Sequence, residues 1–188
     1  MRKLAILVFQ SLDGVMQAPS IPEEDTSGGF TKGGWARSHW DEVMEQVALE
    51  AMSEPYDLLL GRKTYELFSE HNSSVDSPLN DMTKYVITNS LSELDWQNSI
   101  VISGNVAREI SKLKAQDGPL LQVHGSWQLI QELLKNDLVD ELRLWTFPVI
   151  IGSGKRLFTE GVANKKLSLL KSESSPNGAI MSIYRMLE

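Results

Sequence analysis

Four short turns in the sequence carry residue types that could hold a phosphorylated ligand, and the first to consider is Gly61-Arg62-Lys63-Thr64. It follows an apolar run at residues 56–60, as expected where a buried strand leads into a helix. Glycine lets backbone approach a ligand, the N–H groups of a helix start attract phosphate, and Arg62 can bind two oxygens at once. A tight turn with a solvated basic pair is the alternative reading of these residues.

The second turn comes directly after the apolar residues 120–124 and consists of Gly125-Ser126-Trp127-Gln128. A glycine at a strand-to-helix junction again leaves N–H groups that could face a pyrophosphate. An ordinary helix with Ser126 as its N-cap explains the same residues.

Two further turns follow strands predicted at residues 84–88 and 3–10. Thr88-Asn89-Ser90 offers hydroxyl and amide donors for a ribose phosphate, while Asp13-Gly14 could orient an amide or a sugar. Each is also a common turn sequence. Because ligands of open α/β sheets collect at the carboxyl ends of the strands, the shared placement of the four turns favours a nucleotide site.

Other chemistries have weaker support in the sequence. There is no cysteine, which excludes thiol nucleophiles, disulfides and zinc–thiolate sites, and the three histidines show no metal-binding spacing, so no metal is expected. Residues 152–155 resemble a nucleotide-triphosphate loop, but Val149 and Arg156 stand where glycine and Ser or Thr are required. His124 is interpreted as a satisfied, partly buried group. Trp40 and Trp145 could line a pocket for a flat heterocycle, although core packing is the simpler reading.

Composition and charge restrict the class of protein. The chain has 188 residues, 41% of them hydrophobic, which suits one domain over residues 1–188. The net charge of -7 argues against a broad nucleic-acid-binding face. The apolar run at residues 4–9 is too short for a membrane span and lacks a signal-peptide pattern, so we expect a cytoplasmic location.

Apolar runs and helical periodicities alternate along the chain. Helices are predicted from Trp40 to Pro55, from near Thr64, from Val106 and from Gly125 onward, with strands between them. A strand is predicted at residues 138–147, and two more at residues 166–171 and 178–186. This order predicts an α/β fold with a mostly parallel central sheet, helices on both faces and an antiparallel C-terminal strand pair.

The motifs S-L-D-G-V, L-L-L-G-R-K-T-Y-E, K-Y-V-I-T-N-S, V-H-G-S-W-Q-L-I-Q-E-L-L and L-V-D-E-L-R-L-W-T-F-P-V-I-I-G-S-G-K-R-L-F occur in this order. Together they resemble the dihydrofolate-reductase-like family, and the C-terminal reductase domain of the bifunctional riboflavin-biosynthesis deaminase-reductase in particular. The deaminase motifs H-x-E and P-C-x-x-C do not occur in this chain.

The resemblance implies a dihydrofolate-reductase-like fold with NADPH as hydride donor. It places the cofactor phosphates on Gly61, Arg62, Lys63 and Thr64, and the adenosine ribose with its 2′-phosphate near Thr88, Asn89 and Ser90. It also implies that the pyrophosphate and the nicotinamide side of the cofactor contact Gly125, Ser126, Trp127, Gln128 and Leu129. Asp13 and Gly14 would border the nicotinamide. The substrate pocket would include residues 144–147, with Trp145 and Phe147.

The function expected from these observations is an NADPH-dependent reductase of a small heterocyclic substrate, similar to 5-amino-6-(5-phosphoribosylamino)uracil reductase of riboflavin biosynthesis or to dihydrofolate reductase. The alternative is a non-catalytic protein that binds NADPH or senses a ligand. Asp13 or an ordered water is the candidate proton donor. A homodimer is expected because such reductases commonly pair.

Overall fold

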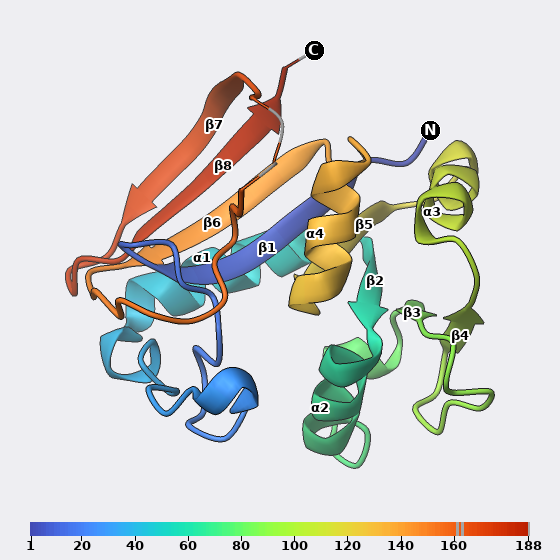
Figure 1. Cartoon of the computed structure of the whole chain (residues 1–188), viewed down its shortest axis with the longest axis horizontal. Coiled ribbons are helices and arrows are strands. Elements are labelled where there is room, and N and C mark those ends of the chain that lie inside the picture. Colours follow the sequence, from blue (N-terminus) through green and yellow to red (C-terminus); the bar gives the residue numbers. More distant parts are fainter. Residues whose placement is uncertain (161, 163, 188) are drawn as a thin grey trace. The chain divides into compact units, whose positions relative to one another are not determined.

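The computed structural model describes residues 1–160, 162 and 164–187 (Figure 1). The chain divides into two compact units, one of Met1–Ile6 with Pro55–Asp140 and the other of Leu7–Glu54 with Glu141–Glu188. Strand β1, Leu4–Ser11, contributes residues to both. The eight strands form one sheet in the order β4-β3-β2-β5-β1-β6-β8-β7. A single domain over the whole chain stays a prediction.

The unit of Met1–Ile6 and Pro55–Asp140 contains the parallel part of the sheet. Each neighbouring pair in β4-β3-β2-β5-β1 is parallel, which agrees with the predicted alternation of strand and helix. Its strands are β2 (Tyr56–Gly61), β3 (Lys84–Ile87), β4 (Ser99–Ile102) and β5 (Leu120–Gly125), and its helices are α2 (Arg62–Asn72), α3 (Val106–Ala115) and α4 (Trp127–Lys135).

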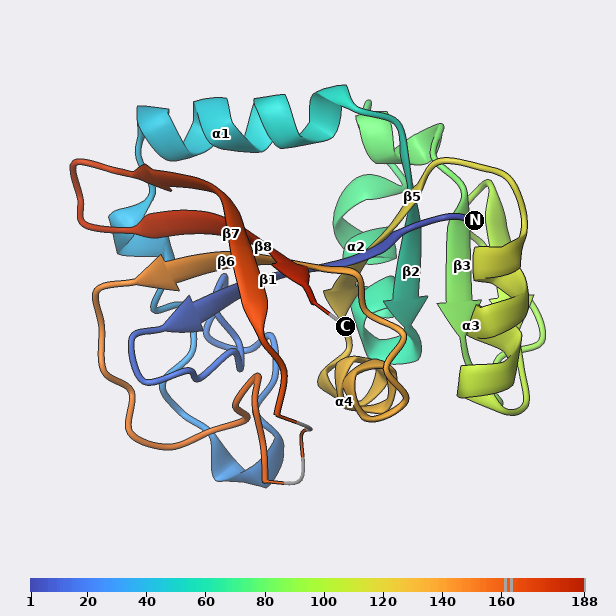
Figure 2. The same ribbon diagram turned by 90° about the horizontal axis from the view of Figure 1, so that it is seen from above.

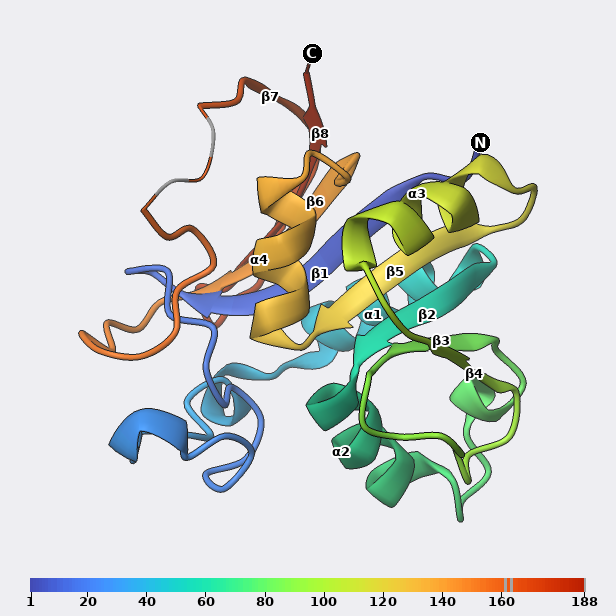
Figure 3. The ribbon, with the colours of Figure 1, turned by 45° about the vertical axis from the view of Figure 1, so that its right-hand side comes forward.

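Helices cover both faces of this parallel part. Leu58 and Leu60 of β2 pack with Tyr65 of α2 in one buried cluster, and strand alternation turns Leu59 to the opposite face. Helix α4 packs against β5 and β2 and also contacts α3. Figure 2 shows α3 and α4 in front of these strands and α2 behind them, and Figure 3 shows α3 and α4 together over β5. The predicted arrangement of helices is confirmed here.

Lys84, the first residue of β3, is fully buried, which its charge did not lead us to expect. Its ammonium donates to the carbonyl oxygens of Asn80, Met82 and Gln97, and it lies 4.4 Å from the centre of the Trp96 ring. Desolvation, opposed by the nearby charge of Asp81, lowers the pKa of Lys84 to about 8. The Lys84 side chain therefore satisfies three loop carbonyl oxygens by hydrogen bonds. In exchange, the folded chain holds a buried positive charge.

The buried Lys84 predicts a pH-dependent stability. The pKa of Lys84 is lower in the folded chain than in the unfolded one, so the folded state is penalised while Lys84 is protonated. This penalty decreases between about pH 8 and the unfolded-state pKa of about 10.4. Relative to Lys84→Met, the wild-type free energy of unfolding should rise by about 2 kcal/mol between pH 7.5 and pH 10. Urea unfolding at both pH values measures this difference. Equal changes in the two proteins would refute it.

The unit of Leu7–Glu54 and Glu141–Glu188 carries the antiparallel strands. Strand β8 (Ile180–Met186) pairs with β6 (Glu141–Phe147) on one side and with β7 (Leu167–Ser174) on the other. This confirms the predicted C-terminal strand pair. Strand β6 begins at Glu141 rather than at Leu138, because the Leu138 N–H bonds back to the Leu133 carbonyl and closes the preceding helix.

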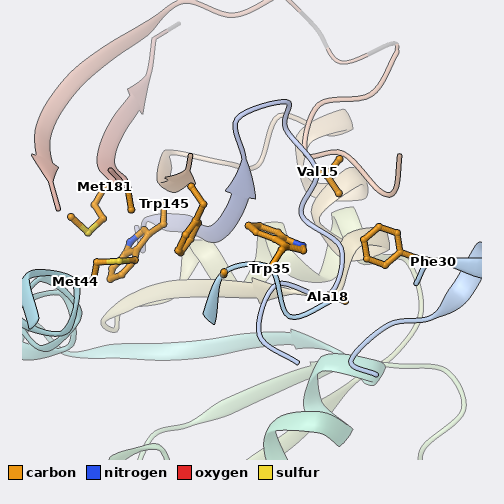
Figure 4. Close-up of a cluster of buried hydrophobic side chains, with 10 residues drawn as sticks. Val15, Ala18, Phe30, Trp35, Met44, Trp145 and Met181 are labelled. Carbon is orange, nitrogen blue, oxygen red and sulfur yellow. The ribbon is translucent and has the colours of Figure 1, made fainter. Parts of the chain in front are cut away.

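Helix α1 (Glu42–Ser53) lies along the antiparallel strands of this unit (Figure 2). Asp41 caps it by accepting a hydrogen bond from the Met44 N–H. Met44, Trp145 and Met181 are buried together in a hydrophobic cluster that extends to Trp35 and Phe30 of the long loop after β1 (Figure 4). The loop is thus packed into the core of its own unit.

The side chains of Leu167, Leu169 and Leu170 on strand β7 are exposed. Exposed apolar side chains on an outermost strand suit an interface between copies. The expected homodimer stays a prediction.

Among the described residues, no helix is long and apolar enough to cross a membrane.

Candidate functional site

Three of the four predicted turns lie at one edge of the sheet. Gly61 of β2 pairs in register with Ile87 of β3, and Leu60 of β2 pairs with Gly125 of β5. Thr88 directly follows Ile87. The turns that begin at Gly61, Thr88 and Gly125 therefore follow the carboxyl ends of three adjacent parallel strands, which is where open α/β sheets bind ligands.

The first turns of α2 and α4 are in close contact at this edge. A Cβ atom added to Gly61 would lie 2.2 Å from the Ser126 hydroxyl oxygen, and one added to Gly125 would lie 2.6 Å from the Thr64 hydroxyl oxygen. Gly125 also has a φ of 152°, which favours glycine. Only glycine at these two positions lets the two helix starts approach so closely. The peptide bond between Gly125 and Ser126 is cis.

Both helices present backbone donors at the same edge. Within the described part of the chain, no side chain caps α2 at Gly61 or α4 at Ser126, whereas Asp41 caps α1 and Asn105 caps α3. The backbone N–H groups of a first helical turn have no partner within the helix, and the helix dipole favours an anion there. The donors are those of Arg62, Lys63 and Thr64 in α2 and of Trp127, Gln128 and Leu129 in α4.

The side chains of these first turns differ in what they can contribute. Arg62 and Lys63 are exposed, and Arg62 forms an ion pair of 2.9 Å with Glu66 that is itself solvent-exposed. Such a surface pair contributes little free energy, so Arg62 can exchange it for a phosphate. The Leu129 side chain is buried, so only its backbone can face a ligand.

The turn after β3 is held by its own polar side chains. The buried Thr88 hydroxyl accepts hydrogen bonds from the N–H groups of Ser90 and Leu91, each at 3.2 Å. The Asn89 side-chain oxygen accepts from the N–H of Gly104, after β4. Asn89 and Ser90 are exposed. Thr88 therefore shapes the turn, while its two neighbours are available to a ligand such as a ribose phosphate.

The fourth predicted turn belongs to the other unit, and its Asp13 is occupied as an anchor. The carboxylate accepts hydrogen bonds from the Ser11 hydroxyl and from the N–H groups of Ile151 and Gly152, and it pairs with Arg156 at 3.2 Å. The hydrogen bond from Ser11 is the largest of the effects that hold the pKa of Asp13 far below its ordinary value.

The carboxylate holds the loop after β1 against residues 151–156. Asp13 as the proton donor stays a prediction. Gly14 takes a φ of 80°, and its carbonyl accepts from the Leu157 N–H. That Gly14 borders the nicotinamide stays a prediction.

The predicted substrate aromatics gather in one unit but are not equally accessible. Trp40 is 42% exposed and stacks on Trp145 with ring centroids 5.5 Å apart. Phe9 contacts the rings of Trp40, Trp145 and Phe147. Phe147 is fully buried, with Trp35 packed against its ring. Its place in the substrate pocket stays a prediction. Trp40 is the most exposed of the three, and Trp145 contributes to the lining of a pocket beside α1 and the antiparallel strands.

No group of three or more His, Asp or Glu side chains suited to a metal ion occurs in residues 1–160, 162 and 164–187. The edge at the starts of α2 and α4 offers backbone N–H donors, hydroxyl groups and the guanidinium of Arg62. Together they suit a phosphorylated organic ligand.

Comparisons with known proteins agree with this assignment of the fold. YyaP from Bacillus subtilis (strain 168), whose function is uncharacterised, is 27% identical over 169 residues, which cover 85% of this chain and 89% of YyaP. A putative riboflavin biosynthesis protein from Shewanella sp. PV-4 superposes with a TM-score of 0.75 at 23% identity and covers 100% of both chains. Dihydrofolate reductase from Enterococcus faecalis, solved with NADP(H) and RAB-propyl, superposes with a TM-score of 0.64 at 15% identity, over 99% of this chain and 97% of that one.

The solved structures confirm the predicted dihydrofolate-reductase-like fold. The model of the RibD C-terminal domain family matches residues 2–181. Because this match spans nearly the whole sequence, the chain belongs to the RibD C-terminal domain family.

Proposed function

We propose that this protein is an NADPH-dependent reductase of a small heterocyclic substrate. The observation that carries the proposal is the close approach of the starts of α2 and α4 at Gly61 and Gly125, beside the turn after β3. Membership of a reductase-like family supports it. So does the Enterococcus faecalis dihydrofolate reductase of similar fold, which was solved with NADP(H).

The residues present fit a dinucleotide with an extra phosphate. In the proposal, the pyrophosphate is bound by the backbone N–H groups of Lys63 and Thr64 in α2 and by those of Gln128 and Leu129 in α4. Gly61 and Gly125 have no side chain, so the pyrophosphate can approach the backbone there. Arg62 and the turn at Ser90 bind the 2′-phosphate, where the guanidinium gives charge-assisted hydrogen bonds. When bound, NADPH supplies the hydride, and the protein orients the reactants and excludes water.

The cofactor half of the proposal predicts a preference for NADPH over NADH. A ligand at a hundred times its dissociation constant raises the free energy of unfolding by about 2.7 kcal/mol, which corresponds to roughly 5–10 °C in Tm for a chain of this size. Thermal unfolding with millimolar NADPH should show such a rise in Tm. NADH lacks the 2′-phosphate that Arg62 would bind, so it should raise Tm by less. No shift with NADPH would rule out this function.

Turnover separates a reductase from the alternative of a non-catalytic NADPH-binding or ligand-sensing protein. We expect NADPH oxidation with a member of a panel of pterins, pyrimidine ribosyl compounds and quinones, including 5-amino-6-(5-phosphoribosylamino)uracil. Binding of NADPH without oxidation across this panel would favour the sensing protein.

A further inference from the structure

A cavity of about 300 Å³ lies between the C-terminal half of α1 and the sheet strands that α1 covers. All of its lining residues belong to the unit of Leu7–Glu54 and Glu141–Glu188, so the cavity is formed within one unit. The lining residues that the structure describes include none of the four predicted turns. Pockets that bind small molecules begin at about this volume. The cavity is therefore a candidate for a second ligand.

The floor of this cavity is apolar. Trp145 of β6 and Met181 of β8 are opposite each other in register, both are buried, and Figure 4 shows them beside Met44 of α1. The other apolar side chains of the lining are those of Leu7, Val47, Ala51 and Ile183. Binding pockets bury the apolar body of a ligand on such a surface, while a few polar groups fix its orientation.

The polar part of the lining contains more carboxylates than cations. Glu50, Glu54 and Glu173 line the cavity, together with Arg143 and Lys171. The Lys171 ammonium lies 3.2 Å from a carboxylate oxygen of Glu50 and 3.7 Å from one of Glu173, so two carboxylates share it. Both pairs are solvent-exposed and contribute little free energy, so a ligand can replace them. Within the described part of the chain, Glu54 takes part in no ion pair.

The end of helix α1 adds further negative charge on the same side. The helix ends at Ser53, with Glu54 as its C-cap, and its sequence contains no lysine, arginine or histidine. The carbonyl oxygens of a last helical turn have no partner within the helix, and the helix dipole favours a cation there. The Ser53 hydroxyl donates to the Glu50 carbonyl and satisfies one of them. The helix side of the cavity thus offers acceptors and negative charge.

We propose that this cavity binds a small organic amine. Its apolar group packs on Trp145 and Met181, and its ammonium group donates charge-assisted hydrogen bonds to Glu54 and to the end of α1. The excess of carboxylates favours a cation over a neutral molecule of the same shape and disfavours an anion. This site goes beyond the proposed reductase activity and does not depend on it.

Three compounds of similar shape test the class of ligand. Near neutral pH, 2-phenylethylamine is a cation, 2-phenylethanol is neutral and 3-phenylpropionate is an anion. We expect calorimetry to give a dissociation constant of about 1 mM or lower for the amine. The alcohol and the anion should bind at least about fivefold more weakly. Equal binding of amine and alcohol, tighter binding of the anion, or no binding of the amine would overturn the proposal.

Substitutions in α1 test the location of the amine. Glu54→Gln keeps the shape of the side chain and removes its charge, so it should weaken amine binding about fivefold. Glu45→Gln is the matched control, because Glu45 is exposed in the first turn of α1 and outside the lining, and it should bind the amine as the wild type does.

Filling the cavity provides a second measurement. Ala51→Leu places a larger side chain in the lining, so it should abolish binding of the amine. Urea unfolding should show that this variant is folded and at least as stable as the wild type, as cavity-filling substitutions commonly are. Wild-type amine affinity in either Glu54→Gln or a folded Ala51→Leu would overturn the assignment of this site.

Discussion

Replacing Gly61 with alanine is expected to weaken NADPH binding at least tenfold, which is about 1.4 kcal/mol of binding free energy. The added Cβ would lie 2.2 Å from the hydroxyl oxygen and 3.0 Å from the backbone nitrogen of Ser126, so the start of α4 must move away from the start of α2. Gly61 has a φ of -76°, which alanine adopts readily, so the effect would be steric and not conformational. Calorimetric titration of NADPH measures it.

A second substitution tests this explanation. Ser126→Gly removes the hydroxyl oxygen and the Cβ atom, two of the three atoms that alanine at position 61 would meet. The loss of NADPH affinity in the double variant should therefore be smaller than in Gly61→Ala alone, which a double-mutant cycle detects as a coupling between neighbours. Additive losses, or an unchanged affinity in Gly61→Ala, would show that the two helix starts do not form the cofactor site together.

The replacement Asp13→Asn is expected to lower the free energy of unfolding by about 2 kcal/mol at pH 7. Asparagine keeps one acceptor oxygen but brings an NH₂ group toward the N–H donors of Ile151 and Gly152 and toward Arg156. One or more of these donors then loses its acceptor. Urea unfolding at pH 7 measures the loss, with Asp76→Asn, on an exposed loop, as the control that should change little.

The same substitution should be less costly in acid. The pKa of Asp13 is lower in the folded chain than in the unfolded one, so its carboxylate contributes stability above about pH 4 and loses it as the pH falls toward the folded-state pKa. The difference in unfolding free energy between wild type and Asp13→Asn should therefore shrink below pH 4. A constant difference from pH 7 to pH 3 would mean that the carboxylate charge is not what anchors this loop.

The local pattern of the sequence was sufficient to predict the elements of the fold. Apolar runs such as Leu58–Leu60 become buried strands, and the glycine at the strand end marks the change to a helix at Arg62. The boundary at Leu138 was missed because its N–H closes a helix turn, a hydrogen bond that apolar periodicity does not reveal. The burial of Lys84 was missed because three loop carbonyls compensate its charge, and these carbonyls come from Asn80, Met82 and Gln97.

The candidate site was predicted in parts and not as an assembly. Gly61 and Gly125 could each be recognised as a strand-end turn, but only the pairing of β2 with β5 brings their helices together. Tertiary contacts also determine the surroundings of Asp13. Asp13 is an anchor because Ile151 and Gly152, far along the chain, donate to it.

A crystal structure of the protein with NADP⁺ would show whether the first turns of α2 and α4 hold the cofactor. We predict density for the pyrophosphate within hydrogen-bonding distance, about 3 Å, of the N–H groups of Lys63 and Thr64 and of Gln128 in the first turns of α2 and α4. The 2′-phosphate should lie between Arg62 and Ser90. A cofactor bound elsewhere on the chain, or clear density for α2 and α4 with no ligand between their first turns at saturating NADP⁺, would contradict the account.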